Sequence, residues 1–251
     1  MRKKHPNFET YGLIGKNISY SFSPKFFEKK FKALKKNAEY LIFDLEEIQQ
    51  VKKIFKKENL KGCNVTIPYK HTVIPFLDQL DPIAKKINAV NTIAFDGEKK
   101  IGYNTDVIGF RDSLKKILKK HHTKALILGN GGAAAAVEEA CYQLNIKSQI
   151  VSRNSQKNII SYQDLSSEII EEFKIIINTT PLGSAHYPEE KPEIPYHFLN
   201  KNHLCYDLIY NPAESLFLKA SKKHGAQIKN GLEMLELQAE ASYAIWQNYS
   251  Q

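Results

Sequence analysis

The stretch "GCNVTIPYK", residues 62–70, places several chemically capable side chains close together. Asn64 and Thr66 are two residues apart in a β-branched run, and Lys70 follows shortly after the run ends at Pro68. Because successive side chains of a strand point to opposite faces, Asn64 and Thr66 are expected on one face. A surface strand has no special use for an amide, a hydroxyl and an ammonium group in this order. The pattern therefore predicts a binding site.

A glycine turn marks a second candidate site. Gly129, Gly131 and Ala134 in "GNGGAA" match the dinucleotide fingerprint G-x-G-x-x-G/A and fall between an apolar strand and a helix. Gly129 permits a tight turn, and Gly131 lets the backbone approach a pyrophosphate, whose oxygens the free N–H groups of the helix N-terminus can bind. Glycine turns between strands and helices are also common for structural reasons alone. The complete strand–turn–helix–strand context favours a cofactor site.

The end of the next strand indicates which dinucleotide would bind. An NAD site carries an Asp or Glu about 20 residues after the fingerprint, whereas "VSRNSQK", residues 151–157, contains no acid. Ser152 and Arg153 occupy the turn, and Lys157 follows. A guanidinium matches the geometry of a phosphate, which a carboxylate would repel. The sequence therefore predicts NADP, although a solvated arginine in a surface loop is a simpler alternative.

The elements that must position these groups alternate between strand and helix. In the first 106 residues this alternation predicts an α/β unit, and in the following part it predicts a parallel sheet with right-handed crossovers. Strands are expected within residues 11–15, 38–45, 61–68, 89–97, 99–104, 124–128, 148–154, 173–183 and 203–210, and helices within residues 24–34, 46–59, 71–77, 81–88, 107–120, 132–145 and 230–247.

Composition restricts the class of protein. The chain has 251 residues, 42% of them hydrophobic and 25% charged, which is close to the average for globular proteins and excludes a disordered or fibrous chain. Its formal net charge of +9 could attract nucleic acid. The lysines are dispersed in short pieces such as Lys29–Lys30 and Lys119–Lys120, without a nucleic-acid-binding signature. We therefore expect solvated lysine-rich faces and no nucleic-acid partner.

Cysteine usage and hydropathy indicate the compartment. Cys63, Cys141 and Cys205 are far apart and form no metal-ligand spacing, which favours a reduced, cytoplasmic protein. Residues 1–15 contain basic side chains without a following apolar segment, so no signal peptide is expected there. No apolar run approaches the length needed to cross a membrane. We expect neither a membrane partner nor a metal site.

Several motifs together resemble the shikimate dehydrogenase family. They occur in the family's order and near its spacings: "SYSFSP", "GCNVTIPYK", "AVNT", "GYNTD", "GNGGA", "SRN", "NTTPLG", "YDLIY" and "GLEMLELQA". The resemblance extends from about Tyr11 to Trp246, and "NVTIPYK" and "NTD" are its specific motifs. It implies reduction of 3-dehydroshikimate to shikimate by NADPH, a step of aromatic amino-acid biosynthesis. It also implies a substrate-binding and catalytic domain of residues 1–106, joined by a C-terminal helix at 231–251, and a Rossmann-type NADP domain of residues 107–230.

The resemblance implies a role for individual residues. Lys70 and Asp106 would be the catalytic pair. The substrate would be bound by Ser21, Ser23, Asn64, Thr66, Asn91, Tyr210 and Gln238, and NADP(H) by Gly129, Asn130, Gly131, Gly132, Ala133, Ser152, Arg153, Lys157, Thr179, Leu208 and Gly231, with Thr180 and Met234 also near the cofactor.

The residue types suit the implied chemistry. Hydride reduction of a ketone leaves an alkoxide, which a lysine ammonium can stabilise and protonate. Asp106 beside Lys70 would favour the charged form of the lysine and could relay the proton in the reverse direction. Shikimate carries three hydroxyl groups and a carboxylate, so neutral donors and acceptors are appropriate for its site.

Simpler roles remain open for several of these residues. Ser23 could be the N-cap of the helix at Pro24, and Asn64 and Thr66 could pair across a sheet. Tyr210 could be an ordinary packed aromatic, and Gln238 an exposed helix residue. One departure concerns the cofactor turn, because Asn130 stands where the family usually has Ala.

Other functions also remain open at this stage. A quinate/shikimate dehydrogenase with relaxed substrate or NAD use is the nearest alternative, although Arg153 argues against NAD. A non-catalytic NADP-sensing regulator is possible, but it would have little need for both Lys70 and Asp106. A methylenetetrahydrofolate dehydrogenase fits "NTD" and the serine loop poorly. Both a monomer and a homodimer are compatible with the sequence.

Overall fold

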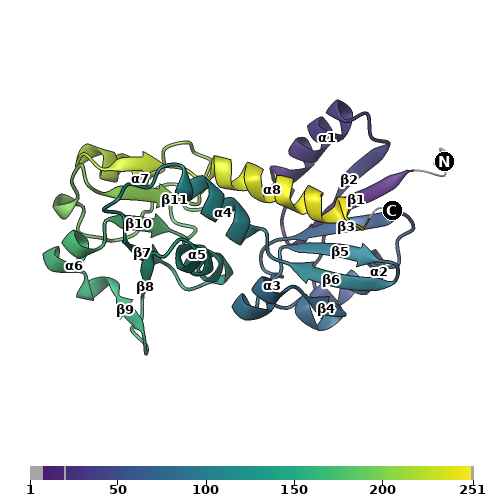
Figure 1. The fold of residues 1–251 in the computed structure, drawn as a ribbon, viewed down its shortest axis with the longest axis horizontal. Coiled ribbons are helices and arrows are strands. Elements are labelled where there is room, and N and C mark those ends of the chain that lie inside the picture. The colour runs from purple at the N-terminus through teal and green to yellow at the C-terminus, as the bar shows by residue number, and fades with distance from the viewer. Residues whose placement is uncertain (1–7, 20, 250–251) are drawn as a thin grey trace. The chain divides into compact units, whose positions relative to one another are not determined.

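The chain divides into two compact units. The computed structural model describes residues 8–19 and 21–249. Residues 1–7, to which part of the signal-peptide prediction refers, lie outside the described part. The first unit contains the residues up to Thr105 together with those from Gln238 onward, and the second unit is Asp106–Leu237 (Figure 1). The division falls one residue before the expected boundary at 106 and inside the C-terminal helix. The functional roles of the two parts stay a prediction.

The first unit is built on a mixed six-stranded sheet. Its strand order is β2-β1-β3-β5-β6-β4. β1 is parallel to β2 and β3, β5 is antiparallel to β3 and β6, and β4 is parallel to β6. The strands are β1 (Glu9–Gly15), β2 (Ala38–Asp44), β3 (Leu60–Val65), β4 (Gln79–Leu80), β5 (Thr92–Asp96) and β6 (Lys99–Tyr103).

An aromatic cluster holds helices on this sheet. Tyr11, Phe27, Phe31 and Trp246 are buried together, and the Trp246 indole N–H donates to the Ile93 carbonyl at 3.0 Å. The helical elements of this unit are α1 (Ser23–Ala33), α2 (Val51–Ile54), α3 (Pro82–Ile87), the 3₁₀ turns Ile48–Gln50 and Ile74–Phe76, and the part of α8 (Leu232–Gln247) from Gln238 onward.

The second unit has an all-parallel sheet of order β12-β11-β10-β7-β8-β9. The chain order reverses between β7 and β10, and this topological switch point is where open α/β sheets bind ligands. The expected α/β fold with a parallel, Rossmann-type sheet is confirmed. The strands are β7 (Lys124–Leu128), β8 (Lys147–Ser152), β9 (Ile159–Ser161), β10 (Ile175–Asn178), β11 (Leu204–Asp207) and β12 (Gln227–Lys229).

Two helices of the second unit each pack on the strand that precedes them and on the strand that follows them in the chain. α5 contacts β7 and β8, and α7 contacts β11 and β12. Buried Ile, Leu and Val side chains of β7, β8 and β10 form the core beneath them. The helical elements are α4 (Asp106–Lys115), α5 (Gly132–Gln143), α6 (Ser167–Glu172), α7 (Leu216–Lys223), the start of α8, and the 3₁₀ turns Tyr162–Asp164 and Tyr196–Phe198.

Several expected elements are shorter than predicted. The helix expected over 46–59 is reduced to a 3₁₀ turn and the four-residue α2, of which only Val51 is buried. So short a helix gains little from propensity and depends on packing. The strand expected over 61–68 ends at Val65, and the region 71–77 forms only a 3₁₀ turn.

Among residues 8–19 and 21–249, no helix is both long and apolar enough to cross a membrane.

Candidate functional site

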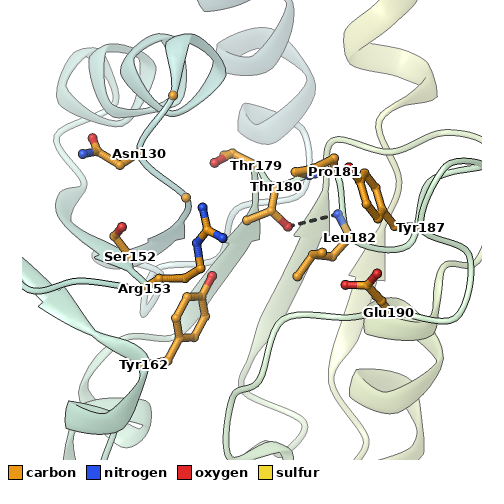
Figure 2. Close-up of a pocket in the computed structure, with 12 residues that line it drawn as sticks. Asn130, Ser152, Arg153, Tyr162, Thr179, Thr180, Pro181, Leu182, Tyr187 and Glu190 are labelled. Carbon is orange, nitrogen blue, oxygen red and sulfur yellow. Dashed lines mark hydrogen bonds between the residues drawn. The ribbon is translucent and has the colours of Figure 1, made fainter.

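A cavity of about 630 Å³ opens in the second unit at the carboxyl ends of β7, β8 and β10. This is the switch point of the parallel sheet, so its location is that expected for a nucleotide site. Figure 2 shows the side chains that surround it. Its walls are Gly129, Asn130, Gly131, Ser152, Arg153, Tyr162, Thr179, Thr180, Pro181, Leu182, Tyr187 and Glu190.

The glycine turn after β7 has the features that a pyrophosphate site requires. Gly129 has a φ of +113°, and a Cβ there would lie 2.6 Å from the Thr179 Oγ1. A Cβ on Gly131 would meet no atom within 4 Å, so the turn is open on that side. Gly131 is also the N-cap of α5 and contributes no side-chain cap. The first N–H groups of α5 are thus suited to anionic oxygens, and the turn fits a dinucleotide.

The other predicted cofactor residues divide into those at the cavity and those away from it. Asn130, Ser152, Arg153 and Thr179 line the cavity. Gly132 and Ala133 begin α5 directly behind the turn. Lys157 is exposed in the connection that follows β8 and is not one of the residues that line the cavity.

Leu208 and Gly231 contact each other outside the cavity wall. A Cβ on Gly231 would lie 2.0 Å from the Leu208 carbonyl oxygen, and the Gly231 N–H donates to the Ile209 carbonyl at 3.1 Å. Gly231 therefore permits the close approach of two chain segments. Tyr210 follows in the same loop after β11, and Met234 is buried on α8, where it starts within the second unit.

The cavity wall at residues 179–182 is held by side-chain hydrogen bonds. The Thr179 hydroxyl donates to the Leu128 carbonyl at 2.7 Å. The Asn178 Oδ1 accepts from the Thr180 N–H at 3.0 Å and from the Thr180 hydroxyl at 2.6 Å. Side chains within the motif "NTTPLG" thus hold the conformation of the loop that the motif forms. Five further wall residues were not anticipated: Tyr162, Pro181, Leu182, Tyr187 and Glu190. Pro181 and Leu182 belong to the quoted motif "NTTPLG", so a signal existed for both, whereas only the fold brings the other three to the cavity.

A buried carboxylate supports this wall from behind. Asp207 is fully buried at the end of β11 and accepts from the Asn178 amide at 3.1 Å, from the Ile209 N–H at 3.0 Å and from the Ser215 hydroxyl. Burial raises the pKa of Asp207 to about 6. Asp207 thereby links the loop that contains Thr180 to the loop that leads to Tyr210. The sequence signal was present in "YDLIY", but the acid within it was not singled out.

A second polar cluster lies in the first unit and contains three predicted substrate residues. The Asn64 amide donates to the Asn91 carbonyl at 3.2 Å and to the Ser242 hydroxyl at 2.9 Å. The Asn91 Oδ1 accepts from the Thr105 N–H at 2.7 Å. The Thr105 hydroxyl lies 3.4 Å from the Gln238 Oε1 and 3.0 Å from the Ser242 hydroxyl. The structure therefore brings Asn64, Asn91 and Gln238 together.

The same cluster contains residues that sequence reasoning missed. The Thr92 hydroxyl lies 2.8 Å from the Ser242 hydroxyl and 3.1 Å from the Thr105 hydroxyl. Thr92 and Thr105 belong to the quoted motifs "AVNT" and "GYNTD", so a signal existed for both. Ser242 had none, because it reaches the cluster only through the packing of α8.

The serine loop connects to this cluster through Tyr40. The Tyr40 hydroxyl donates to the Asn64 Oδ1 at 2.8 Å. Burial raises the pKa of Tyr40 well above its usual value, and a hydrogen bond with Ser23 opposes this rise. Ser23 is the first residue of α1, whose N-cap is Phe22, so the alternative role of Ser23 as N-cap is wrong. The Ser21 hydroxyl accepts from the Ser23 N–H at 3.4 Å.

The turn that carries Lys70 is anchored beside Asn91. The Lys70 carbonyl accepts from the Val90 N–H at 2.8 Å, and the Asn91 carbonyl accepts from the Val65 N–H at 2.8 Å. Thr66 lies just past β3, where its N–H donates to the Ile14 carbonyl at 2.9 Å. The expectation that Thr66 and Asn64 lie on one face stays a prediction.

Asp106 follows Thr105 directly and is the first residue of α4. Lys70 belongs to the first unit, whereas Asp106 belongs to the second. Their pairing and the roles of the predicted site residues stay predictions.

A parallel sheet with a glycine turn at its switch point, an arginine at the end of the next strand and an attached α/β unit defines a two-part dinucleotide-binding protein. Comparison with known proteins specifies the family. Residues 13–93 match the family model described as the shikimate dehydrogenase substrate binding domain. A shikimate dehydrogenase (NADP(+)) of Clostridium botulinum (strain 657 / Type Ba4) is 40% identical over 94% of this chain and 96% of its own length.

Two solved structures agree with this match. The shikimate dehydrogenase of Aquifex aeolicus has a TM-score of 0.88 and 34% identity, covering 97% of this chain and 94% of that chain. A shikimate dehydrogenase in complex with NADP+ also has a TM-score of 0.88, with 32% identity over 98% of this chain and 92% of that chain. The chain belongs to the shikimate dehydrogenase family of oxidoreductases.

Proposed function

We propose that this protein reversibly reduces 3-dehydroshikimate to shikimate with NADPH, in the pathway to aromatic amino acids. The observation that carries the proposal is the polar cluster of the first unit. It gathers Asn64, Asn91, Thr105 and Gln238, and the backbone of the Lys70 turn is hydrogen-bonded to the segment that leads into Asn91. The amide and hydroxyl groups of this cluster, together with the Lys70 ammonium group that we propose acts on the ketone, suit a small polyhydroxylated keto acid.

NADPH, when bound, supplies the hydride. The Lys70 ammonium group stabilises the negative charge that develops on the substrate oxygen and donates a proton to it. Asp106 favours the charged form of Lys70 and helps to remove the proton in the reverse direction.

The remaining predicted residues orient the two molecules. Ser21, Ser23, Asn64, Thr66, Asn91, Tyr210 and Gln238 hold the hydroxyl groups and the carboxylate of the substrate. Asn64 and Asn91 are themselves fixed by the hydrogen bonds of the cluster, so their orientation is set before the substrate arrives.

The cofactor is held by the cavity of the second unit. The turn at Gly129, Asn130 and Gly131 and the start of α5, with Gly132 and Ala133, bind the pyrophosphate. Ser152, Arg153 and Lys157 select the 2′-phosphate, and Thr179, Leu208 and Gly231 support the nicotinamide half. Arg153 lines the cavity wall, which favours NADP over NAD.

We further propose a cytoplasmic location and small-molecule partners only. The three free cysteines are all buried and unpaired by disulfides, as in a reducing compartment. A monomer or a homodimer is compatible with this function.

The test is absorbance at the nicotinamide band with shikimate or quinate and with NADP+ or NAD+. We expect reduction of NADP+ with shikimate, and we expect Lys70→Ala to lower kcat by about 10²-fold or more. Lys57→Ala is the matched control, because Lys57 is an exposed lysine of the same unit. Comparable turnover of quinate or NAD+ would indicate the broader quinate/shikimate dehydrogenase. Binding of NADP+ without any turnover would instead indicate a sensor.

A further inference from the structure

The connection between β8 and β9 is unusual for a parallel sheet. The two strands are parallel neighbours, yet only residues 153–158 join Ser152 to Ile159. A parallel pair normally needs a crossover of about a dozen residues or more, and that crossover usually contains a helix. The edge of the second unit next to Arg153 is therefore built by β9 and by the turn that follows it.

The strand register places Tyr162 directly beside Arg153. Ser152 pairs with Ser161 at the ends of β8 and β9, so Arg153 and Tyr162 are the residues that directly follow two adjacent strands. Both line the cavity, and Figure 2 shows the guanidinium and the phenol hydroxyl on the same side of it. The Asp164 carboxylate accepts from the Ser161 N–H at 2.7 Å and from the Ser161 hydroxyl at 2.8 Å, which fixes the turn that carries Tyr162.

The surroundings of Tyr162 determine its chemical form. Its half-buried ring packs against the apolar core of the second unit, so the ring direction is held. Burial raises the pKa of Tyr162 to about 12, and the nearby Arg153 charge opposes that rise. The phenol therefore stays protonated at neutral pH and offers an O–H donor to an acceptor in the cavity.

We propose that Tyr162 is a specificity-determining residue whose hydroxyl donates a hydrogen bond to the 2′-phosphate of NADP(H) beside Arg153. This inference rests on the proposed cofactor of the protein. The guanidinium provides charge and the phenol provides a directed neutral donor, so the two recognise one phosphate together. NAD lacks that phosphate and cannot make this pair of contacts with it.

The test measures binding of two cofactor fragments by calorimetry, independent of catalysis. Adenosine 2′,5′-bisphosphate carries the 2′-phosphate, whereas 5′-AMP lacks it. We expect Tyr162→Phe to weaken binding of the bisphosphate about 10-fold, as for loss of a hydrogen bond to a charged group, and to change 5′-AMP binding less than about twofold. Tyr142→Phe is the matched control, because Tyr142 is 70% exposed on α5 of the same unit.

A second variant protects the test against a folding defect. Tyr162→Met retains apolar packing without a hydroxyl, and we expect the same selective loss. Equal weakening of both nucleotides, or no weakening of either, would overturn the role of Tyr162 and assign it to packing. If the unmodified protein binds both fragments equally, the proposed preference for NADP itself fails. If it prefers the bisphosphate but does not oxidise shikimate, only the proposed reaction fails.

Discussion

Asp207 has the properties of a group that is retained for function at some expense of stability. It is fully buried, and its hydrogen-bond donors are the Asn178 amide, the Ile209 N–H and the Ser215 hydroxyl. Buried acids without compensation for lost hydration destabilise the folded state when they ionise. Because the loops it joins carry Thr180 and Tyr210, its benefit lies in fixing those loops.

The first prediction concerns the pH dependence of stability. The pKa of Asp207 is raised from 3.8 to about 6 on folding, so the folded state keeps the proton between these values. The contribution of Asp207 to the free energy of unfolding is therefore highest below about pH 4 and declines as the pH rises through about 6, by roughly 3 kcal/mol. We expect Asp207→Asn to remove this decline in urea unfolding measured from pH 4 to 8.

A matched control for this prediction is Glu189→Gln, which changes an exposed acid of the same unit. That variant should keep the pH profile of the unmodified protein. An unchanged profile in Asp207→Asn would show that another group titrates in this range.

The glycine turn allows two neighbouring substitutions with opposite expectations. A Cβ on Gly129 would lie 2.6 Å from the Thr179 Oγ1, at a φ of +113° that other residues rarely adopt. Gly129→Ala should therefore lower the free energy of unfolding by about 1–3 kcal/mol.

Gly131→Ala should leave the free energy of unfolding almost unchanged, because the added methyl meets no protein atom within 4 Å. The methyl should instead weaken NADP+ binding, measured by calorimetry, about 10-fold or more. Tight NADP+ binding by Gly131→Ala would contradict close approach of the cofactor at this turn.

Residue-level predictions from sequence succeed where a motif is local. The turn at Gly129 to Gly131 could be placed at a cavity because strand, glycines and helix are consecutive. Tyr162 could not be placed at the cavity from sequence, since its proximity to Arg153 depends on the register of β8 and β9. Ser242 could not be placed in the polar cluster from sequence, because its partner Thr92 is 150 residues away in the chain.

At the scale of secondary structure, α8 is the element that completes the polar cluster. Ser242 lies within 2.9 Å of the Asn64 amide and within 2.8 Å of the Thr92 hydroxyl, and it donates to the Gln238 carbonyl at 2.9 Å. The orientation of Gln238 toward Thr105 therefore depends on how this helix packs on β3 and β5.

We predict that Ser242→Ala lowers the free energy of unfolding by about 1–3 kcal/mol, because buried partners lose a hydrogen bond. It should also raise the KM for shikimate severalfold while the KM for NADP+ stays nearly constant, which steady-state kinetics can check. Gln49→Ala, at an exposed position of the same unit, is the control. An equal change in both KM values would mean that the substitution acts on the whole fold.

The sequence did not predict β4, β9, β12, α6 and α7. β4, β9, β12 and α6 are each six residues or shorter, and α7 has eight residues. Such short pieces gain stability from neighbours that are distant in sequence. The longer strands β7 and β10 are runs of buried aliphatic residues, and they could be recognised from the chain alone.

At the scale of the whole molecule, the α/β alternation was sufficient to predict two parts, because each part has its own sheet and its own buried core. The chain passes between the parts at Thr105–Asp106 and again within α8. The proposed catalytic pair draws one residue from each part. The proposed mechanism therefore requires both units to contribute to one reaction.

This requirement gives the last prediction. Lys70→Ala and Asp106→Asn should each lower kcat by about 10²–10⁴-fold, since each removes part of one proton-transfer device. Residues that act as a unit have strongly non-additive effects, so the double variant should be no slower than the more impaired single variant. Stopped-flow reduction of NADP+ with shikimate measures this, and unchanged calorimetric binding of NADP+ shows that the second unit is intact. If the fold-decrease in kcat of the double variant equals the product of the two single decreases, Lys70 and Asp106 act independently. Asp106 of the second unit would then have no share in the proton transfer by Lys70.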